Sequence, residues 1–367
     1  MLLVGPVPPP EFGVARATEL MLESSTLAKH LDIYHLDTSD CRSVANIGRL
    51  DFRNLYLGIK HVCQLAGLAL RKRPDVTLLT ASQGTLGLLR DGLLVLTSRM
   101  FRSKVVCYLR GGGYADLRAT RGRLAAWTLR RICRSSARVL VLSHNLVDMA
   151  HAVHPKAKVA VVPNGCPPAV RPDQAGGRDE SHPVLLYMGK LSHKKGLSDV
   201  LRAAGKMARS VPGLEFVIAG GWDPPEYQQH TRRLIQDLDL SDTVRFVGPV
   251  AGDEKTDLLA RAWVVVVPSH SEGQPWVILE AMSAGIPVVA TDTGAIAETV
   301  ADGVSGFVVP IGDTAALAER MRALLTDDEL WLRMKKASLE EHRARFAVER
   351  SHTLLAEELR LVVFDRG

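Results

Sequence analysis

The chain has 367 residues, of which 46% are hydrophobic and 23% are charged, and its formal net charge at pH 7 is +6. This length is typical of two globular domains rather than one. The five cysteines are an odd number without a CxxC pair, which argues against a disulfide framework or a zinc site and indicates a reducing, cytoplasmic compartment. No run of 18 apolar residues occurs, so no membrane-spanning helix is expected.

The charge is distributed unevenly along the chain. Residues 1–170 hold 23 Lys and Arg against 11 Asp and Glu, whereas the remainder holds 23 against 29. A strongly basic first half indicates an anionic partner. No recognition-helix pattern, RNA-binding signature or zinc knuckle is present, so we do not expect nucleic acid. A membrane surface or a phosphorylated acceptor fits this charge better.

Short apolar runs alternate with longer helical patterns along the whole chain. The opening "MLLVGPVPPP" predicts a first strand and loop rather than a signal peptide. The runs that follow it lie at residues 30–37, 75–82, 104–111, 137–144, 157–165, 183–191, 214–221, 243–250, 263–269, 287–292 and 306–310. Near-continuous apolar strands between helices indicate buried strands in parallel sheets. The predicted fold class is therefore α/β, with two doubly wound Rossmann-like domains facing a central cleft.

The domain boundary is predicted in the stretch 166–183, which is rich in proline, glycine and charge. We predict a first domain over residues 1–170, a linker over 171–183 and a second domain over 184–345. The tail, residues 346–367, is predicted to be a helix whose apolar positions are Phe346, Leu354, Leu355 and Leu359.

The stretch "SHSEGQPWVILEAMSAGIPVVATDTG" places Glu272 before an apolar helix and Glu280 inside it. Pro275 fits the first turn of that helix and Gly285 fits its C′ position. The helix follows a strand, so its N-terminus suits a phosphate, and the carboxylates suit hydroxyl groups. A nucleotide sugar carries both kinds of group. The alternative is a pair of solvated glutamates beside a core helix.

A second loop, in "LLYMGKLSHKKGLSDVLRA", supplies cations. Lys190 directly follows a strand, and Lys195 precedes Gly196 and the next helix. Two lysines in a strand-to-helix loop can neutralise a diphosphate. A solvated basic loop is the alternative, but the two loops together favour a ligand site.

With "MGKLSHKKG", "FVGPV", "VVPNG" and the E-x7-E stretch, the chain resembles the retaining GT-B glycosyltransferases, specifically glycosyltransferase family 4. The motifs cover the second half, reach back to residue 161, and match the first half only loosely. The resemblance implies metal-independent transfer from a UDP or GDP sugar, without a cofactor, to a glycan, lipid-linked or other anionic acceptor. It implies an acceptor-side first domain, a nucleotide-sugar-binding second domain, and a last helix that returns to the first domain.

The same resemblance implies roles for individual residues. Glu272 and Arg110 occupy the catalytic positions, with Glu272 contacting hydroxyls of the donor sugar. Arg110 stands where the family commonly has a histidine; an arginine cannot accept a proton, but it can bind a phosphate or an anionic acceptor. Glu280 would hold the ribose. The implied donor-binding set is Gly13, Lys190, Lys195, Val250, Gln274, Trp276, Val277 and Glu280.

Two rival functions share this architecture, a catalytically silent nucleotide-sugar-binding protein and a sugar-nucleotide epimerase.

A further feature is the basic segment between Arg118 and Arg138, which also holds the apolar residues Leu124, Trp127 and Ile132. It is typical of a membrane-surface helix and predicts peripheral binding to the inner face of an anionic membrane. An ordinary surface helix with a solvated basic face is the alternative.

Overall fold

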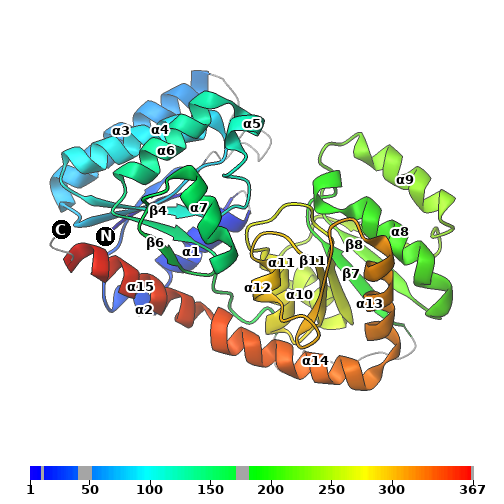
Figure 1. Cartoon of the computed structure of the whole chain (residues 1–367). Coiled ribbons are helices and arrows are strands. Elements are labelled where there is room, and N and C mark those ends of the chain that lie inside the picture. The colour runs from blue at the N-terminus through cyan, green and yellow to red at the C-terminus, as the bar shows by residue number, and fades with distance from the viewer. Residues whose placement is uncertain (10–11, 40–51, 171–181, 365–367) are drawn as a thin grey trace. The chain divides into compact units, whose positions relative to one another are not determined.

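The structure is a computed structural model that describes residues 1–9, 12–39, 52–170 and 182–364 (Figure 1). The contacts divide it into two compact units, one formed by Met1–Gly165 with Val348–Gly367 and the other by Cys166–Ala347. Most of the predicted linker, residues 171–183, lies outside the described residues. No helix within the described ranges is long and apolar enough to cross a membrane.

The first unit is built on a six-stranded parallel sheet in the order β2-β1-β3-β4-β5-β6. All six strands fall in the predicted runs, so this half of the fold prediction is confirmed. Leu78 and Leu79 of β3 and Val105 to Leu109 of β4 are buried because helices cover both faces of the sheet. The strands are β1 Leu2–Gly5, β2 Tyr34–Asp37, β3 Val76–Thr80, β4 Lys104–Leu109, β5 Arg138–Val141 and β6 Val159–Val161.

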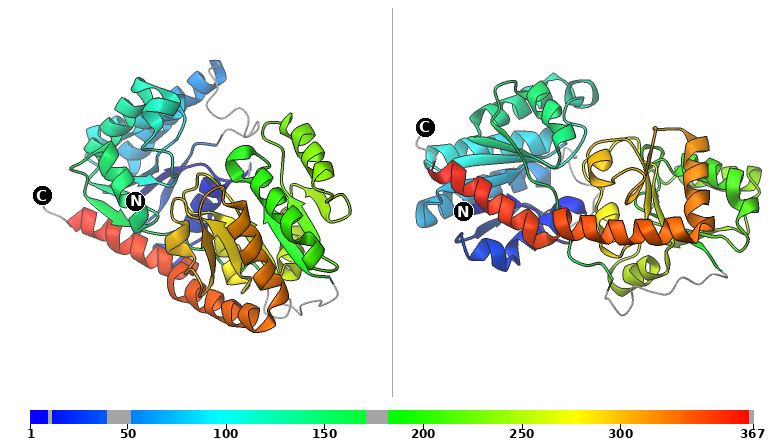
Figure 2. Two further views of the ribbon diagram at one scale, coloured as in Figure 1. Left: turned by 45° about the vertical axis from the view of Figure 1, so that its right-hand side comes forward. Right: turned by 60° about the horizontal axis from the view of Figure 1, so that its bottom comes forward.

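The helices of the first unit form two layers. Right-handed crossovers between parallel strands put α3, α4 and α6 on one face, where α4 packs between the other two (Figures 1 and 2). Helices α2 and α15 pack together on the opposite face. The helices are α1 Gly13–Leu22, α2 Ser25–Ala28, α3 Phe52–Lys72, α4 Thr85–Met100, α5 Leu117–Arg121, α6 Arg123–Ser135, α7 Val147–Val153 and α15 Val348–Phe364.

Helix α15 is joined to the first unit by apolar contacts and by hydrogen bonds. Leu355, Leu359 and Val362 are buried, and α15 packs on α2, β3 and β4. The Ser351 hydroxyl donates to the Pro163 carbonyl over 2.6 Å. The tail prediction is wrong at one position: Phe346 lies in a π-helical turn, His342–Phe346, and packs in the core of the second unit.

Two buried histidines of the first unit, His61 on α3 and His352 on α15, make its stability depend on pH. Burial, with Arg90 or Arg110 as a nearby positive charge, lowers the pKa of each to about 4. Each is therefore neutral when folded, while the unfolded chain binds a proton below about pH 6.5. We expect the contribution of each neutral histidine to the free energy of unfolding to be fully present above pH 6.5. It should fall towards pH 4, by about 2 to 3 kcal/mol per histidine.

Urea unfolding at pH 7.5 and pH 4.5, with His352→Gln and His61→Gln as variants, measures this loss. The free energy of unfolding should differ between pH 7.5 and pH 4.5, and each substitution should reduce this difference by the contribution of the histidine that it removes. His30, which is exposed to solvent in the same unit, offers a matched control, since His30→Gln removes no buried imidazole and should leave the difference unchanged. An unaltered pH dependence in both buried variants would assign the acid sensitivity to carboxylates instead.

The second unit repeats the architecture, with a parallel sheet in the order β12-β11-β10-β7-β8-β9. Its six strands also lie in the predicted runs. Burial differs at one of them: β9 is an edge strand, and Arg245 and Phe246 are exposed. The strands are β7 Val184–Met188, β8 Glu215–Ala219, β9 Val244–Gly248, β10 Val264–Val267, β11 Val288–Thr291 and β12 Gly306–Val309.

Seven helices between Leu197 and Glu341 cover this second sheet in the described part of the unit. Apolar side chains fill the space on both sides of the sheet, with Phe216 and Ile218 in one cluster and Val217 and Ile278 in the other. The helices are α8 Leu197–Met207, α9 Tyr227–Asp237, α10 Gly252–Arg261, α11 Trp276–Ser283, α12 Ile296–Thr299, α13 Thr314–Thr326 and α14 Asp328–Glu341.

Candidate functional site

The candidate site lies where the strand order of the second sheet reverses. The chain runs outwards from β7 through β8 to β9 and then returns to β10, on the other side of β7. The loops that follow β7 and β10 therefore leave the same edge of the sheet as neighbours. In open α/β sheets this switch point is where ligands bind.

Lys195 and Glu272 meet at this point. The Lys195 Nζ lies 2.5 Å from the Glu272 Oε1, and both side chains are largely shielded, with exposed fractions of 30% and 12%. The Ser269 hydroxyl donates to the same carboxylate oxygen over 2.8 Å. The structure thus brings together a cation and a carboxylate that are 77 residues apart in the sequence.

The loop that carries Lys195 is fixed from both sides. The Tyr187 hydroxyl donates to the carbonyls of Lys190 and Lys195, at 2.8 and 3.3 Å, and burial raises its pKa, so it stays protonated. Gly196 has a φ of +70°, and a Cβ there would lie 1.8 Å from the Pro268 carbonyl oxygen. Only glycine fits this position, because it tolerates the left-handed conformation and leaves room for the neighbouring loop.

Glu280 has a different partner. Its Oε1 lies 2.5 Å from the Nζ of Lys255 on α10, and only 13% of its side chain is exposed. The helix that carries it begins at Trp276, so the prediction that Pro275 forms the first turn is wrong: Pro275 has an extended ψ of 127° and is the N-cap. The predicted C′ position is confirmed, since Gly285 has a φ of +72°.

The other predicted donor residues of this unit are not part of the two shielded ion pairs. Lys190 pairs with Asp223 over 2.9 Å, and both side chains are more than half exposed. Gln274 is buried, and its amide donates to the Thr299 hydroxyl over 3.1 Å. The remaining three predicted donor residues of this unit are half-buried and pack against its apolar core: Val250, Trp276 and Val277.

Arg110 follows β4 in the first unit and is packed closely by its neighbours. Its guanidinium lies 4.0 Å from the centre of the Tyr108 ring and donates to the Asn164 side-chain oxygen over 2.5 Å. Burial lowers its pKa. Its Nε is buried without a hydrogen-bond partner, and no carboxylate among the described residues pairs with it. Within the described ranges, the arrangement therefore holds a cation whose charge no acidic side chain balances.

Gly13, the remaining predicted residue, is exposed at the first position of α1 in the same unit as Arg110.

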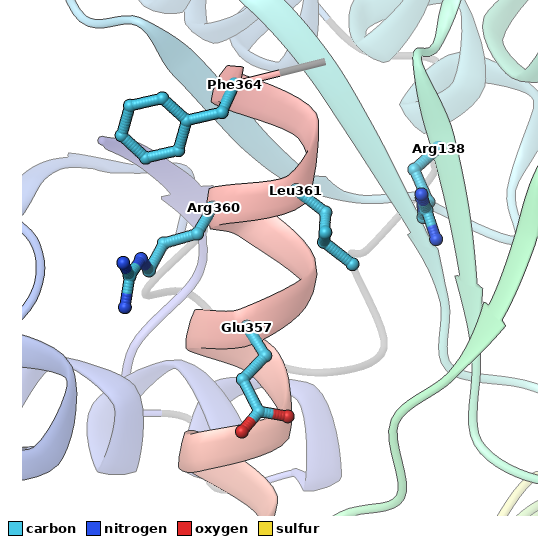
Figure 3. Close-up of a pocket in the computed structure, with 5 residues that line it drawn as sticks. All are labelled: Arg138, Glu357, Arg360, Leu361 and Phe364. Carbon is cyan, nitrogen blue, oxygen red and sulfur yellow. The ribbon is translucent and has the colours of Figure 1, made fainter.

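A hollow of about 550 Å³ opens in the first unit beside α15 (Figure 3). It is lined by Arg138, Glu357, Arg360, Leu361 and Phe364. Arg138 begins β5, so the hollow lies at the amino edge of the sheet, opposite the edge where such sheets bind ligands.

Sequence reasoning did not single out Tyr187, Lys255 or Ser269. Lys255 lies in "GDEKTD", where acidic neighbours are typical of a solvated helix, and nothing in the sequence pairs it with Glu280. Tyr187 carried a usable signal, because it is a hydroxyl-bearing residue near the end of an otherwise aliphatic strand. A buried hydroxyl at that place needs a partner in the loop that follows.

Two doubly wound units with charged loops at a switch point define the class: the chain has the GT-B fold of glycosyltransferases. Residues 172–341 match the family "Glycosyl transferases group 1", and residues 26–165 match "Glycosyl transferase 4-like domain". Together these matches cover more than four fifths of the chain. The chain belongs to this glycosyltransferase family, which confirms the resemblance drawn from its motifs.

Curated relatives match part of the chain. Glycogen synthase of Mycobacterium tuberculosis (strain ATCC 25618 / H37Rv) is 33% identical over 50% of this chain and 43% of its own length. D-inositol 3-phosphate glycosyltransferase of Corynebacterium urealyticum is 31% identical over 62% of this chain and 58% of its own length. The matches thus span about two fifths to three fifths of these relatives.

Two solved structures match over nearly the full length of the chain. Sucrose-phosphate synthase from Thermosynechococcus elongatus has a TM-score of 0.77 at 20% identity and covers 98% of both chains. HepE from Anabaena, solved with UDP-glucose, has a TM-score of 0.76 at 20% identity and covers 98% of this chain and 99% of its own. At these identities the likeness confirms the fold.

Proposed function

We propose that the protein transfers a sugar, with retention of configuration, from a nucleotide-diphosphate sugar to a glycan, lipid-linked or other anionic acceptor. The observation that carries this proposal is the Lys195–Glu272 pair at the switch point of the second sheet. A diphosphate can replace Glu272 as the ion-pair partner of the Lys195 ammonium. The carboxylate of Glu272 is then available to accept hydrogen bonds from hydroxyl groups of the sugar. HepE, with the same fold, was solved with UDP-glucose, which supports a nucleotide-sugar donor.

The charge at the site supports a reaction that needs no metal ion. Lys195 and Lys190 lie on one loop, and their ammonium groups can neutralise the charge that develops on the leaving diphosphate. The N-terminus of α11 presents free N–H groups at the end of the β10 loop. In a retaining transfer of this kind, a phosphate oxygen of the leaving group can accept the proton of the acceptor.

Arg110 fits substrate binding rather than proton transfer. A guanidinium stays charged and cannot act as a base. Its contacts with Tyr108 and Asn164 hold it in place, while its charge has no acidic partner among the described residues. We propose that it binds an anionic group of the donor or of the acceptor.

A panel of UDP and GDP sugars tests the function. Thermal shifts of the purified protein identify the donor, and release of the nucleoside diphosphate from that donor measures slow hydrolysis. A silent binding protein would show the shift without release. An epimerase would convert the sugar of the donor into another sugar, which NMR detects. The configuration of the anomeric carbon in the product of the transfer shows whether it is retained.

The two glutamates are expected to act on different parts of the donor, because each has its own lysine. Glu280→Gln should weaken the binding of both the nucleoside diphosphate and the sugar donor by about tenfold, since a ribose hydroxyl loses a charged acceptor. Glu272→Gln should leave nucleoside diphosphate binding within about threefold and lower turnover about a hundredfold. Calorimetry and initial rates measure the two effects.

Glu319→Gln, a single carboxylate change at an exposed position on α13 of the same unit, offers a control and should affect neither assay. If Glu272→Gln and Glu280→Gln behave alike in both assays, the division between sugar and ribose is wrong.

A further inference from the structure

Helix α4 turns an apolar stripe away from the sheet that it covers. Along α4, Leu86, Leu89, Leu93, Leu96 and Met100 recur at the period of one helical face. The last three are 54%, 58% and 73% exposed, while Leu88, Leu94 and Val95 on the opposite face are buried. Both faces of this helix are therefore apolar, and only one of them is used by the core of the unit.

The neighbouring helices extend the stripe into a surface. On α3, which packs against α4, the exposed residues Tyr56, Ile59 and Leu70 lie at helical spacing. On α6, at the other side of α4, Leu124 and Trp127 are 52% and 60% exposed. We call the outward side chains of α3, α4 and α6 the three-helix face.

Tight packing makes the three-helix face continuous. A Cβ at Gly92 of α4 would lie 3.3 Å from the Thr128 Cγ2 of α6, so the glycine lets these two helices approach closely. Eight of the fifteen large apolar side chains that are exposed in the described chain lie on this face. Single exposed apolar residues are normal, but a contiguous group of them marks an interaction surface.

The charge around this face selects the occupant. Residues 52–135 hold 16 Lys and Arg against 3 Asp. One of the acids, Asp91, is buried and pairs with Arg90 over 2.9 Å. A second copy of the chain would bring the same positive charge to the contact, which repulsion disfavours. An anionic lipid surface offers both the negative charge and the apolar interior.

Arginines stand next to the apolar residues in the way that an interface between lipid and water requires. Arg123, Arg130, Arg131 and Arg134 are exposed on α6, and the Arg131 guanidinium lies 5.9 Å from the Trp127 ring centre. Two residues of the predicted membrane-binding segment, Arg118 to Arg138, do not belong to this surface. Ile132 is buried, and Arg138 pairs with Glu358 over 2.7 Å, so neither is available to a partner.

We propose that the three-helix face docks on an anionic lipid bilayer, with its apolar side chains among the lipid headgroups and acyl chains and its arginines on the phosphates. An amphipathic surface of this kind lies in the plane of the interface without crossing it. The binding is reversible and is weakened by salt, because part of the attraction is electrostatic.

Cosedimentation with vesicles tests the proposal. The full chain should sediment with vesicles of phosphatidylcholine and phosphatidylglycerol, and much less with phosphatidylcholine alone or in high salt. Replacing Arg130, Arg131 and Arg134 by Gln should weaken binding on the order of 100-fold, from about fivefold per arginine. Replacing Leu93, Leu96 and Met100 by Gln should also release the protein, through the apolar part of the interaction.

Matched controls lie in the second unit. The triple variant with Gln at Arg232, Arg233 and Arg333 removes the same charge from exposed positions, and Leu332→Gln removes an exposed apolar side chain. These controls should bind vesicles like the parent. All variants should keep their circular dichroism spectrum and their nucleoside diphosphate affinity. Equal binding to both kinds of vesicle, or parental binding by either three-helix-face variant, overturns the proposal.

Cys63 provides a direct reporter, because it is exposed on α3 while Cys107, Cys133 and Cys166 are buried. An environment-sensitive dye on Cys63, in a chain with Cys41→Ser, should shift its emission to the blue with anionic vesicles. Sedimentation without this shift would mean that another surface docks. Concentration-dependent dimerisation that the Leu93, Leu96 and Met100 variant abolishes, without vesicle binding, would identify a second copy as the occupant and overturn the proposal.

Discussion

Deleting residues 348–367 should unfold the first unit while the second unit stays folded. Helix α15 contributes Leu355, Leu359 and Val362 to the first unit, each no more than 3% exposed. Removing one buried leucine side chain typically costs about 2 to 5 kcal/mol. Removing the whole helix uncovers the part of the sheet, at β3 and β4, on which it packs. This loss reaches the typical net stability of a domain, about 5 to 15 kcal/mol.

Hydrogen exchange read out along the chain distinguishes the units. In the truncated protein, β3 and β4 should lose protection, whereas β7 and β10 should keep it, together with nucleoside diphosphate binding. Point variants give a matched comparison within the same helix. Leu355→Ala and Leu359→Ala should destabilise strongly, and Leu361→Ala and Phe364→Ala, at positions 56% and 72% exposed, should not. Unchanged protection in the truncated protein would show that the sheet is stable without α15.

Lys195→Ala should weaken binding of the nucleoside diphosphate by about 1.5 to 3 kcal/mol, or roughly 10- to 150-fold, because a charged hydrogen bond to phosphate is lost. The same change leaves the shielded Glu272 without its cation, so turnover of the sugar donor should fall further than binding does. Calorimetry with UDP and GDP, and the rate of nucleoside diphosphate release, measure the two effects.

Lys194 is the natural control for this experiment. It carries the same charge on the same loop but is exposed, and its neighbour Lys195 alone reaches Glu272. Lys194→Ala should change the affinity by less than about threefold, as expected of a solvated charge. Equal losses in both variants would mean that the loop attracts phosphate by its general charge, and an unaffected Lys195→Ala variant would remove this residue from the site.

The architecture could be read from the sequence because burial on two faces leaves a strong pattern. Apolar runs such as "VLLYM" and "WVVVV" leave no polar face for solvent, and they are separated by segments long enough for a crossover helix. All twelve strands lie in such runs. The edge strands β2, β6 and β9 depart from full burial, and their place at the edge of a sheet is not evident from the runs of residues.

The candidate site was only partly readable. The spacing of Glu272 and Glu280 and the two lysines before Gly196 are local features, and they pointed to a nucleotide sugar. Their pairing is not local. Glu272 meets Lys195 because β7 and β10 are neighbours, and Glu280 meets Lys255 because α10 and α11 pack on the same sheet. The roles of these residues in binding and catalysis stay predictions for the experiments above.

Two parallel α/β sheets, the family, the charged loops and the excess of positive charge in the first half could all be inferred from the order of the amino acids. Which apolar residues belong to a core depends on how the helices and sheets pack in three dimensions. Phe346 and Leu355 have the same hydrophobic character, yet they pack in different units. On α4, Leu93 is exposed and Leu94 is buried. The hydrophobic effect depends on buried area and not on direction, so a helix that is apolar on both faces does not specify which face meets the sheet.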